Sequence, residues 1–313
     1  LDRLEQSSSQ SRDVLVLALA GFAAQSREPA VPARLEKLLA SAQGGERDAL
    51  LGLLGRVPTA EAVATEARIV ERSRMARDRA KFAEALAAHP GEDTRLVALL
   101  VDPAESVRAN AAWSLGEIGS SADLPVLEHA LADANVDVAG NALEAMARIA
   151  RRNKGRIAAL ACARVSEPRP MLRAVALRAL RFNAERCEHG EELAALAHDR
   201  NDFARKSAAA LLRDVSRGKR DAEALAQARD HDPSSAVAAE CDGPAPPAPN
   251  GVDATSIFVI PPGEDMPAPE QPFALLRADG LVRLGVSDRR GEVFEVKAPH
   301  GSLSLVETAS GFE

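Results

Sequence analysis

The sequence predicts a mainly α protein, an α-solenoid of about seven helical pairs followed by a small all-β, sandwich-like domain. Two observations predict this fold. A pattern of apolar, small and acidic positions recurs at steps of 31 to 34 residues, and after a Pro-rich stretch short segments with alternating apolar and polar residues begin. The predicted parts are the solenoid over residues 1–241, the linker over 242–253 and the β domain over 254–313.

The repeat is clearest between Asp102 and Gly119, where a turn precedes a helix whose apolar residues share one face. Each later repeat keeps an apolar residue, a small one four positions on, a large apolar one eight positions on and an acidic one five positions before. The first apolar column contains Val107, Val138, Leu172, Ala204 and Val237, and the small column contains Ala111, Ala142, Ala176, Ala208 and Cys241. The large apolar column contains Leu115, Met146, Leu180 and Leu212, and the acidic column contains Asp102, Asp133, Glu167, Asp199 and Asp232. One pair alone cannot bury its apolar face, so we expect stacking to stabilise the array.

Before residue 94 the pattern is weaker but still indicates helices. Leu50 and Leu54 keep the spacing of the columns. In the helix expected over 75–89, Ala76 and Ala80 fill the first two columns, and Glu84 falls on the large apolar one. The expected helices here are 13–24, 31–42, 46–57, 59–73 and 75–89.

The pattern acidic-x4-apolar-Arg-x2-Ala-Ala-x2-Leu-Gly-x-Ile-Gly resembles the HEAT repeat, in particular the bacterial, phycobilisome-lyase-like type, from Arg95 to Val215. The resemblance implies a ladder in which the acidic residue and the Arg six positions later hydrogen-bond between neighbouring repeats. Ala139 stands where the ladder needs an Arg, so one rung should be missing. The pairs that keep the spacing are Asp102/Arg108, Glu167/Arg173 and Asp199/Arg205, and earlier in the chain Glu71/Arg77.

Turn sequences divide the residues after the linker into short strands. Their order, D-G, then D-x-x-G, then P-x-G before the last strand, resembles that of carboxypeptidase-regulatory-like or transthyretin-like β modules. Such modules recur in secreted and envelope-associated bacterial proteins, so the resemblance favours a bacterial envelope or periplasm over the cytoplasm. The expected strands are 256–260, 273–277, 281–286, 292–296 and 302–306.

Composition limits the partners. Residues 241–313 carry 11 acidic and 5 basic residues, and the helical part is near neutral, so neither part has the basic excess of a nucleic-acid binder. No apolar run is long enough to span a membrane. The three cysteines, Cys162, Cys187 and Cys241, are odd in number and lie in or beside helices, which favours buried small residues over a disulfide framework.

Motifs for chemistry are lacking. None of the six histidines is followed by Glu, as in the di-iron proteins of HEAT type, and no phosphate loop, C-x-x-C or Ser/His/Asp order occurs. The sequence therefore predicts no catalytic residues, metal or cofactor. The alternative is an enzyme that resembles the HEAT-like bilin lyases or DNA glycosylases. The glycosylases use a basic groove with aromatic residues, whereas this chain has a single tryptophan, Trp113, no tyrosine and balanced charge in its helical part, so phosphate binding has little support.

The predicted function is a non-enzymatic scaffold that binds a protein or peptide on the concave face of the solenoid and takes part in assembling a bacterial envelope or secretion complex. Positions three, six and ten after the Val107 column face outward on the second helices, which line that face in HEAT arrays. Trp113 among amide and charged side chains has the composition of a binding hot spot. The alternative is that Trp113 wedges between helices and the charges are solvated. The predicted partner-binding residues are Asn110, Trp113, Glu117, Asn141, Glu144, Arg148 and Arg178.

Overall fold

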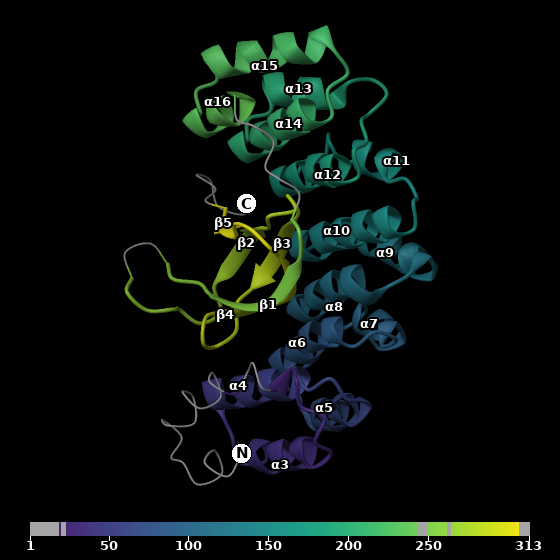
Figure 1. Ribbon diagram of the computed structural model, residues 1–313, viewed down its shortest axis with the longest axis vertical. Coiled ribbons are helices and arrows are strands. Elements are labelled where there is room, and N and C mark those ends of the chain that lie inside the picture. The colour runs from purple at the N-terminus through teal and green to yellow at the C-terminus, as the bar shows by residue number, and fades with distance from the viewer. Residues whose placement is uncertain (1–18, 20–22, 243–248, 262–263, 307–313) are drawn as a thin grey trace. The chain divides into compact units, whose positions relative to one another are not determined.

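The computed structural model describes residue 19 and residues 23–242, 249–261 and 264–306 (Figure 1). The chain is mainly helical and ends in a few antiparallel strands that form two small sheets, which confirms the predicted fold class. By contacts it divides into two compact units. Unit 1 contains the described residues up to Gly119 with 253–273 and 285–297, and unit 2 contains Ser120–Val252, 274–284 and those from Ala298 on.

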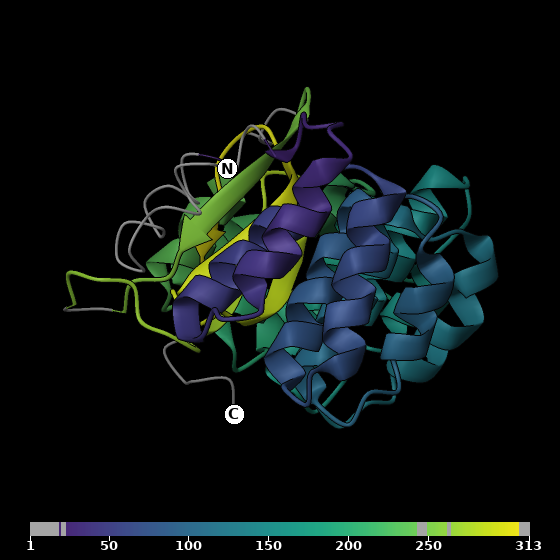
Figure 2. The ribbon, with the colours of Figure 1, turned by 90° about the horizontal axis from the view of Figure 1, so that it is seen from below.

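Unit 1 contains three second helices, α4, α6 and α8, packed in that order, with first helices beside them. In Figure 1, α5 and α7 lie on the side away from β4. Figure 2 shows β4, in yellow, beside the purple helices at the start of unit 1. The helices are α3 (Ala30–Leu39), α4 (Gly44–Gly55), α5 (Ala60–Arg72), α6 (Ala76–Ala85), η1 (Leu86–Ala88), α7 (Asp93–Leu99) and α8 (Glu105–Ile118).

Unit 2 continues the same pairing, with α10, α12, α14 and α16 packed in sequence. Its helices are η2 (Ser121–Asp123), α9 (Leu124–Ala130), α10 (Val136–Arg152), α11 (Ala158–Cys162), α12 (Pro170–Phe182), α13 (Glu191–His198), α14 (Asp202–Asp214), α15 (Lys219–His231) and α16 (Ser235–Asp242). Every residue of the three apolar columns except Cys241 is at most 2 % exposed, so the repeat pattern is the core.

The strands form a two-stranded sheet, β1-β4, and a three-stranded sheet, β3-β2-β5. In the second sheet β2 and β5 are antiparallel, with Leu275 opposite Leu305. The turn between β2 and β3 contains Gly280, whose φ of +87° favours glycine. The strands are β1 (Val252–Phe258), β2 (Pro272–Leu276), β3 (Val282–Val286), β4 (Glu292–Pro299) and β5 (Ser304–Leu305), close to the predicted ones.

The acidic column performs two tasks in the turns. In Asp199 and Asp232, one carboxylate oxygen accepts the backbone N–H two residues later, which fixes the turn before the next helix. The same carboxylates receive two hydrogen bonds each from the preceding repeat, Asp199 from Arg173 at 2.6 Å and Asp232 from Arg205 at 2.7 and 2.9 Å. The ladder implied by the resemblance is therefore present in unit 2. In unit 1 Arg79 binds Asp102 in the same way.

At Ala139, where an Arg of the ladder is missing, Arg169 of the next repeat connects the two turns instead. Arg169 donates from Nε to Glu167 at 2.9 Å and from Nη1 to the carbonyl of Asp133, also at 2.9 Å. One side chain thus connects two successive turns of unit 2 without an Arg at position 139.

The register predicted for the helix at 75–89 is wrong by two residues. Arg79 occupies the ladder position, so Asp78, Phe82 and Leu86 stand in the three columns, and Leu86 is fully buried. The repeat was misread because an aspartate occupies the first column. Asp78 is tolerated there because Arg47 donates to it at 2.8 and 2.9 Å.

The expectation that the cysteines are unpaired is wrong for two of them. Cys162 at the end of α11 and Cys187 in the loop before α13 form a disulfide, with their Cα atoms 5.6 Å apart. Cys241 is a free thiol, half-buried in α16. The sequence gives no signal for this disulfide, because the two cysteines are 25 residues apart and the total number of cysteines is odd.

The helix expected over residues 13–24 and much of the linker at 242–253 lie outside the described residues. The domain boundaries 1–241, 242–253 and 254–313 stay a prediction, and the strand segments divide by contacts between the two units. Among the described residues no helix has the length and apolar character needed to cross a membrane.

Candidate polypeptide-binding face

In unit 2, α10 holds a strand through its inner face. Asn135 caps the N-terminus of the helix, because its Oδ1 accepts the N–H groups of Asp137 and Val138. This fixes the start of the helix and with it the face on which Asn141 lies. Asn141 donates from Nδ2 to the carbonyl of Leu284 at 2.9 Å and accepts the N–H of Leu284 at 3.0 Å. Its amide therefore satisfies both backbone groups of one strand residue, as a neighbouring strand would.

Glu144, one turn further along α10, accepts the N–H of Val282 at 2.9 Å. Its side chain is fully buried, and burial raises its pKa to about 8 although Arg148 opposes the shift. At neutral pH the carboxyl group is therefore mostly protonated, and a neutral acid is the form that tolerates this site. A charged Glu144 would be costly to bury.

Arg178 of α12 completes this contact by donating from Nη1 to the carbonyl of Gly280 at 3.1 Å. Burial, together with nearby Arg181, lowers its pKa to about 10. Gly140 permits the close approach of the strand, because a Cβ there would lie 2.6 Å from Cδ1 of Leu284. The residues of α10 and α12 thus recognise the strand mainly by its backbone.

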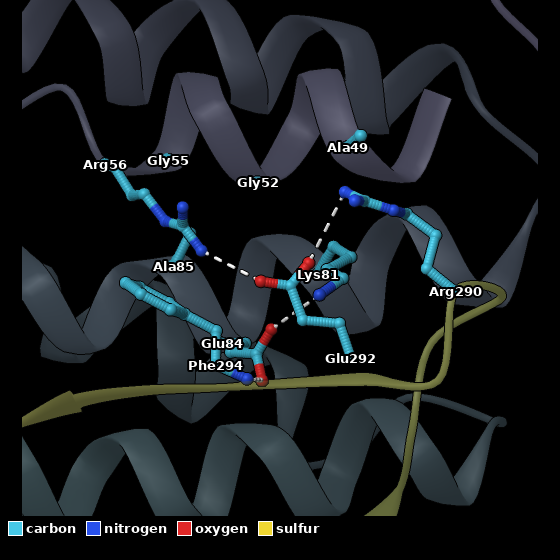
Figure 3. Close-up of a pocket in the computed structure, with 10 residues that line it drawn as sticks. All are labelled: Ala49, Gly52, Gly55, Arg56, Lys81, Glu84, Ala85, Arg290, Glu292 and Phe294. Atoms are coloured by element: carbon cyan, nitrogen blue, oxygen red, sulfur yellow. Dashed lines mark hydrogen bonds and ion pairs between the residues drawn. The ribbon is translucent and has the colours of Figure 1, made fainter. Parts of the chain in front are cut away.

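In unit 1, charged side chains hold β4 and the loop before it (Figure 3). Arg56 at the end of α4 donates to Glu292 at 3.1 Å, and its guanidinium lies 3.9 Å over the ring of Phe294. Lys81 of α6 contacts Glu84 at 3.0 Å and Asp288 at 3.1 Å. All of these residues except Asp288 line a cavity of about 20 Å³, which has space for one water molecule.

The charges of this cluster in unit 1 compensate one another. Burial alone lowers the pKa of Lys81, but Glu84, Asp288 and Glu292 outweigh it, so that its pKa is raised and the ammonium group stays charged. Burial also raises the pKa of Glu66 well above its usual value. Paired charges and a cavity of this size fit a structural network and leave no space for an organic ligand.

The structure covers the sequence-predicted patch with the chain's own residues. Asn141, Glu144, Arg148 and Arg178 are between 0 and 5 % exposed, and three of them bind the β2–β3 turn and β3. The prediction that they form an open surface needs this correction, because their observed partner is the same chain. Binding of a separate protein by these residues stays a prediction.

The remaining three predicted residues lie in α8 of unit 1. Trp113 is 2 % exposed, so it packs in the interior and not on an open face. Asn110 donates to the carbonyl of Ala80 at 3.0 Å, which ties α8 to α6. The carbonyl of Glu117 accepts from Lys297 at 3.4 Å. Trp113 is therefore not part of an exposed patch.

An open cleft of about 600 Å³ was missed by the sequence reasoning. It lies in unit 2, where α10, α12 and α14 end, and the segments around residues 249–252, 278–279 and 299 form the rest of its wall. Phe182 occupies an outward position in the repeat. The helix-end residues that join it come from three different helices and share no common spacing, so no sequence pattern indicates that they meet. The residues of the wall at or just after the helix ends are Arg151, Arg181, Phe182, Ala184, Asp214 and Val215.

Comparisons with known proteins agree with this architecture. Residues 67–147 match the family model of HEAT repeats. A search among curated proteins finds no match. The chain is similar to the solved structure of the Escherichia coli protein YibA, with 19% identity, a TM-score of 0.51 and coverage of 76% of this chain and 88% of that chain. At this identity the similarity shows the fold alone.

A second similar structure is human deoxyhypusine hydroxylase in complex with glycerol. It has 17% identity and a TM-score of 0.37, and the match covers 72% of this chain and 96% of that chain. A score this low supports no argument about the site. The chain is therefore mainly helical, with residues 67–147 similar to HEAT repeats, and it ends in a small β region.

Proposed function

We propose that this protein is a non-enzymatic scaffold that binds an extended segment of a protein partner and takes part in assembling a larger complex. The observation that supports this proposal is the pair of hydrogen bonds between Asn141 and the backbone of Leu284. Side chains that recognise the backbone of an extended segment accept many sequences, as in β-augmentation. The helices of unit 2 thus already bind one extended polypeptide, the chain's own.

The open cleft of unit 2 is the proposed place for the partner. The guanidinium of Arg151 lies 4.4 Å over the ring of Phe182, and Arg181 donates to Asp214 at 2.5 Å. Aromatic and arginine side chains dominate binding hot spots, and a cleft of about 600 Å³ is within the usual range of ligand sites. We expect a partner segment with an apolar side chain for Phe182 and charged residues beside it.

The test uses a displayed library of extended peptides that is selected on the full chain. Peptides that bind the wild type are then measured with Phe182→Ala by fluorescence anisotropy. Loss of a hot-spot aromatic weakens binding by about tenfold or more. The matched control is Val101→Ser, which changes a residue of unit 1 that is 80% exposed and lies outside the cleft.

Equal affinity for the wild type and Phe182→Ala would contradict the cleft as the site, and absence of any selected peptide would contradict the scaffold function. Catalytic turnover that is lost with a cleft variant would instead favour the enzyme alternative. The near-neutral charge of the helical part supports a protein partner over nucleic acid.

The proposal also covers the type of the repeats and of the β module, and the cellular location of the protein. We assign the repeats to the bacterial, phycobilisome-lyase-like type and the strands to a carboxypeptidase-regulatory-like or transthyretin-like module, on the sequence patterns described above. The Cys162–Cys187 disulfide supports an oxidising compartment such as the bacterial envelope, because disulfides persist there. Fractionation of the source cells, with the fraction that contains the chain as the readout, tests this location.

A further inference from the structure

A group of potential metal ligands surrounds the disulfide of unit 2. The Sγ atom of Cys187 and one carboxylate oxygen each of Glu191 and Glu192 lie within 4.8 Å of one another. The Sγ atom of Cys162 is bonded to that of Cys187 and so lies beside this group. One sulfur and two oxygen donors are therefore gathered at the start of α13, and a second sulfur is bonded to the first.

Contacts other than the disulfide hold the two cysteine-bearing segments together. The carboxylate of Glu185 accepts the N–H groups of Ile157 and Ala158 at 3.0 and 2.9 Å, at the start of the helix that ends in Cys162. Arg217 donates to the carbonyl of Cys187 at 3.0 Å. Cleavage of the disulfide leaves these bonds intact, so we expect both sulfur atoms to stay close together in the reduced protein.

Glu192 has a carboxylate oxygen available for a ligand. Its Oε1 accepts from Nε of Arg186 at 2.5 Å, whereas its buried Oε2 has no hydrogen-bond partner. The residue is 1 % exposed, and Arg186 is fixed in turn by Asp221 at 2.8 Å. A carboxylate held by a second residue through one oxygen is the usual arrangement of a metal ligand. An unpartnered buried oxygen is otherwise costly.

We propose that reduction of the Cys162–Cys187 disulfide creates a Zn²⁺ site whose ligands are the two thiolates, Glu192 through Oε2, and Glu191. A dithiol reductant supplies two electrons and two protons, the S–S bond breaks, and the reductant becomes a disulfide. Zn²⁺ then displaces the two thiol protons, which pass to solvent, and two Zn–S bonds form. In the oxidised protein the sulfur atoms are bonded to each other and the site is closed to the ion.

The donor set selects the metal. Two thiolates and two carboxylates suit a tetrahedral Zn²⁺, with expected distances of about 2.3 Å to sulfur and about 2.1 Å to oxygen. Ca²⁺ and Mg²⁺ prefer oxygen donors only, so they should not compete. Arg186 and Arg217 add positive charge beside the four anionic ligands, which offsets part of their mutual repulsion.

The experiment measures the Zn²⁺ bound to the full chain by competition with a chromophoric chelator. It compares oxidised protein with protein reduced by a phosphine, a reductant that has no thiol of its own to bind Zn²⁺. Reduced wild type should bind one Zn²⁺ per chain with a native helical circular dichroism spectrum, and Zn²⁺ should raise its Tm. Oxidised protein should show neither effect. Co²⁺ in place of Zn²⁺ should give a thiolate charge-transfer absorption.

Two substitutions separate the site from nonspecific thiol binding. Glu192→Gln keeps an oxygen for Arg186 but removes the ligand charge, and it should weaken Zn²⁺ binding by tenfold or more. Cys241→Ser removes the thiol outside the site and should bind as the wild type does. The proposal is overturned if reduced wild type binds no Zn²⁺ or loses its helical spectrum, if Glu192→Gln binds equally well, or if Cys241→Ser abolishes binding.

Discussion

The two units hold strand segments of the same C-terminal region by different means. In unit 1 charged side chains of α4 and α6 meet charged side chains such as Glu292 and Asp288. In unit 2 Asn141 and Glu144 bind backbone groups of β3. Pairs of side chains require a particular sequence in the strand, whereas backbone contacts do not. The contacts in unit 1 therefore depend more on the sequence of the segment, although Glu84 also accepts the N–H of Phe294 at 3.4 Å. The contacts in unit 2 depend less on it.

The largest expected effect of a substitution lies in unit 1. Lys81→Met removes the cation between Glu84 and Asp288 and leaves two buried carboxylates without it. Breaking a buried charge cluster in this way costs about 3–5 kcal/mol. Urea unfolding of the variant measures the loss, and the double variant with Asp288→Asn should recover part of it. A loss below about 1 kcal/mol would show that unit 1 does not depend on these charges.

Glu144 gives unit 2 a pH dependence with a defined sign. Its pKa is raised by burial to about 8, so the folded state retains a proton that the unfolded state releases above about pH 4.5. Its contribution to stability is therefore complete below that pH and is lost as the pH rises towards 8. Relative to Glu144→Gln, the wild type should lose on the order of 3 kcal/mol between pH 5 and 8. Parallel stability curves for the two proteins would refute the assignment.

The disulfide stabilises unit 2. Replacing both Cys162 and Cys187 by serine opens a loop of 25 residues and should cost about 3 kcal/mol. Native-state hydrogen exchange should show the loss in α11 to α13, with α4 and α6 unchanged. The control is Cys241→Ser, whose thiol has no disulfide partner. An equal loss of protection in α4 and α6 would contradict a stabilisation confined to unit 2.

The smallest effect compares two asparagines of the same repeat column. Asn141→Ala leaves the N–H and the carbonyl of buried Leu284 without their partner and should cost about 2–3 kcal/mol. Asn110→Ala breaks one half-buried hydrogen bond to Ala80 and should cost about 1 kcal/mol. Chemical denaturation of the two variants under the same conditions measures the difference. Equal costs would mean that the strand contact in unit 2 contributes little.

The sequence predicted the repeats well because their columns are local. Val107, Ala111 and Leu115 mark one helix face within nine residues, and the strands alternate within five or six. The place of Asn141 outside the apolar columns, at a position that the sequence analysis expects to face a partner, follows from the same spacing. Its partner Leu284 is 143 residues away, and no local pattern indicates that contact. This is why the sequence indicates the helix face on which Asn141 lies but not the segment that covers it.

Two other features were beyond the sequence for related reasons. Asp78 stands in an apolar column because Arg47, 31 residues earlier, neutralises it, so the pattern there was read in the wrong register. Glu192 looks like an ordinary first-turn acid of a helix until its burial and its contact with Arg186 are known. In both, the decisive information is a tertiary pairing of charges.

Native-state amide hydrogen exchange of β3 is the most direct test of the central claim, that the helices of unit 2 bind an extended segment through its backbone. The amides of Val282 and Leu284 should be strongly protected in the wild type, and Asn141→Ala should speed exchange at Leu284 by tenfold or more. Asn110→Ala should leave both amides unchanged. Exchange of these amides at the rate of an unstructured peptide in the wild type would contradict the account.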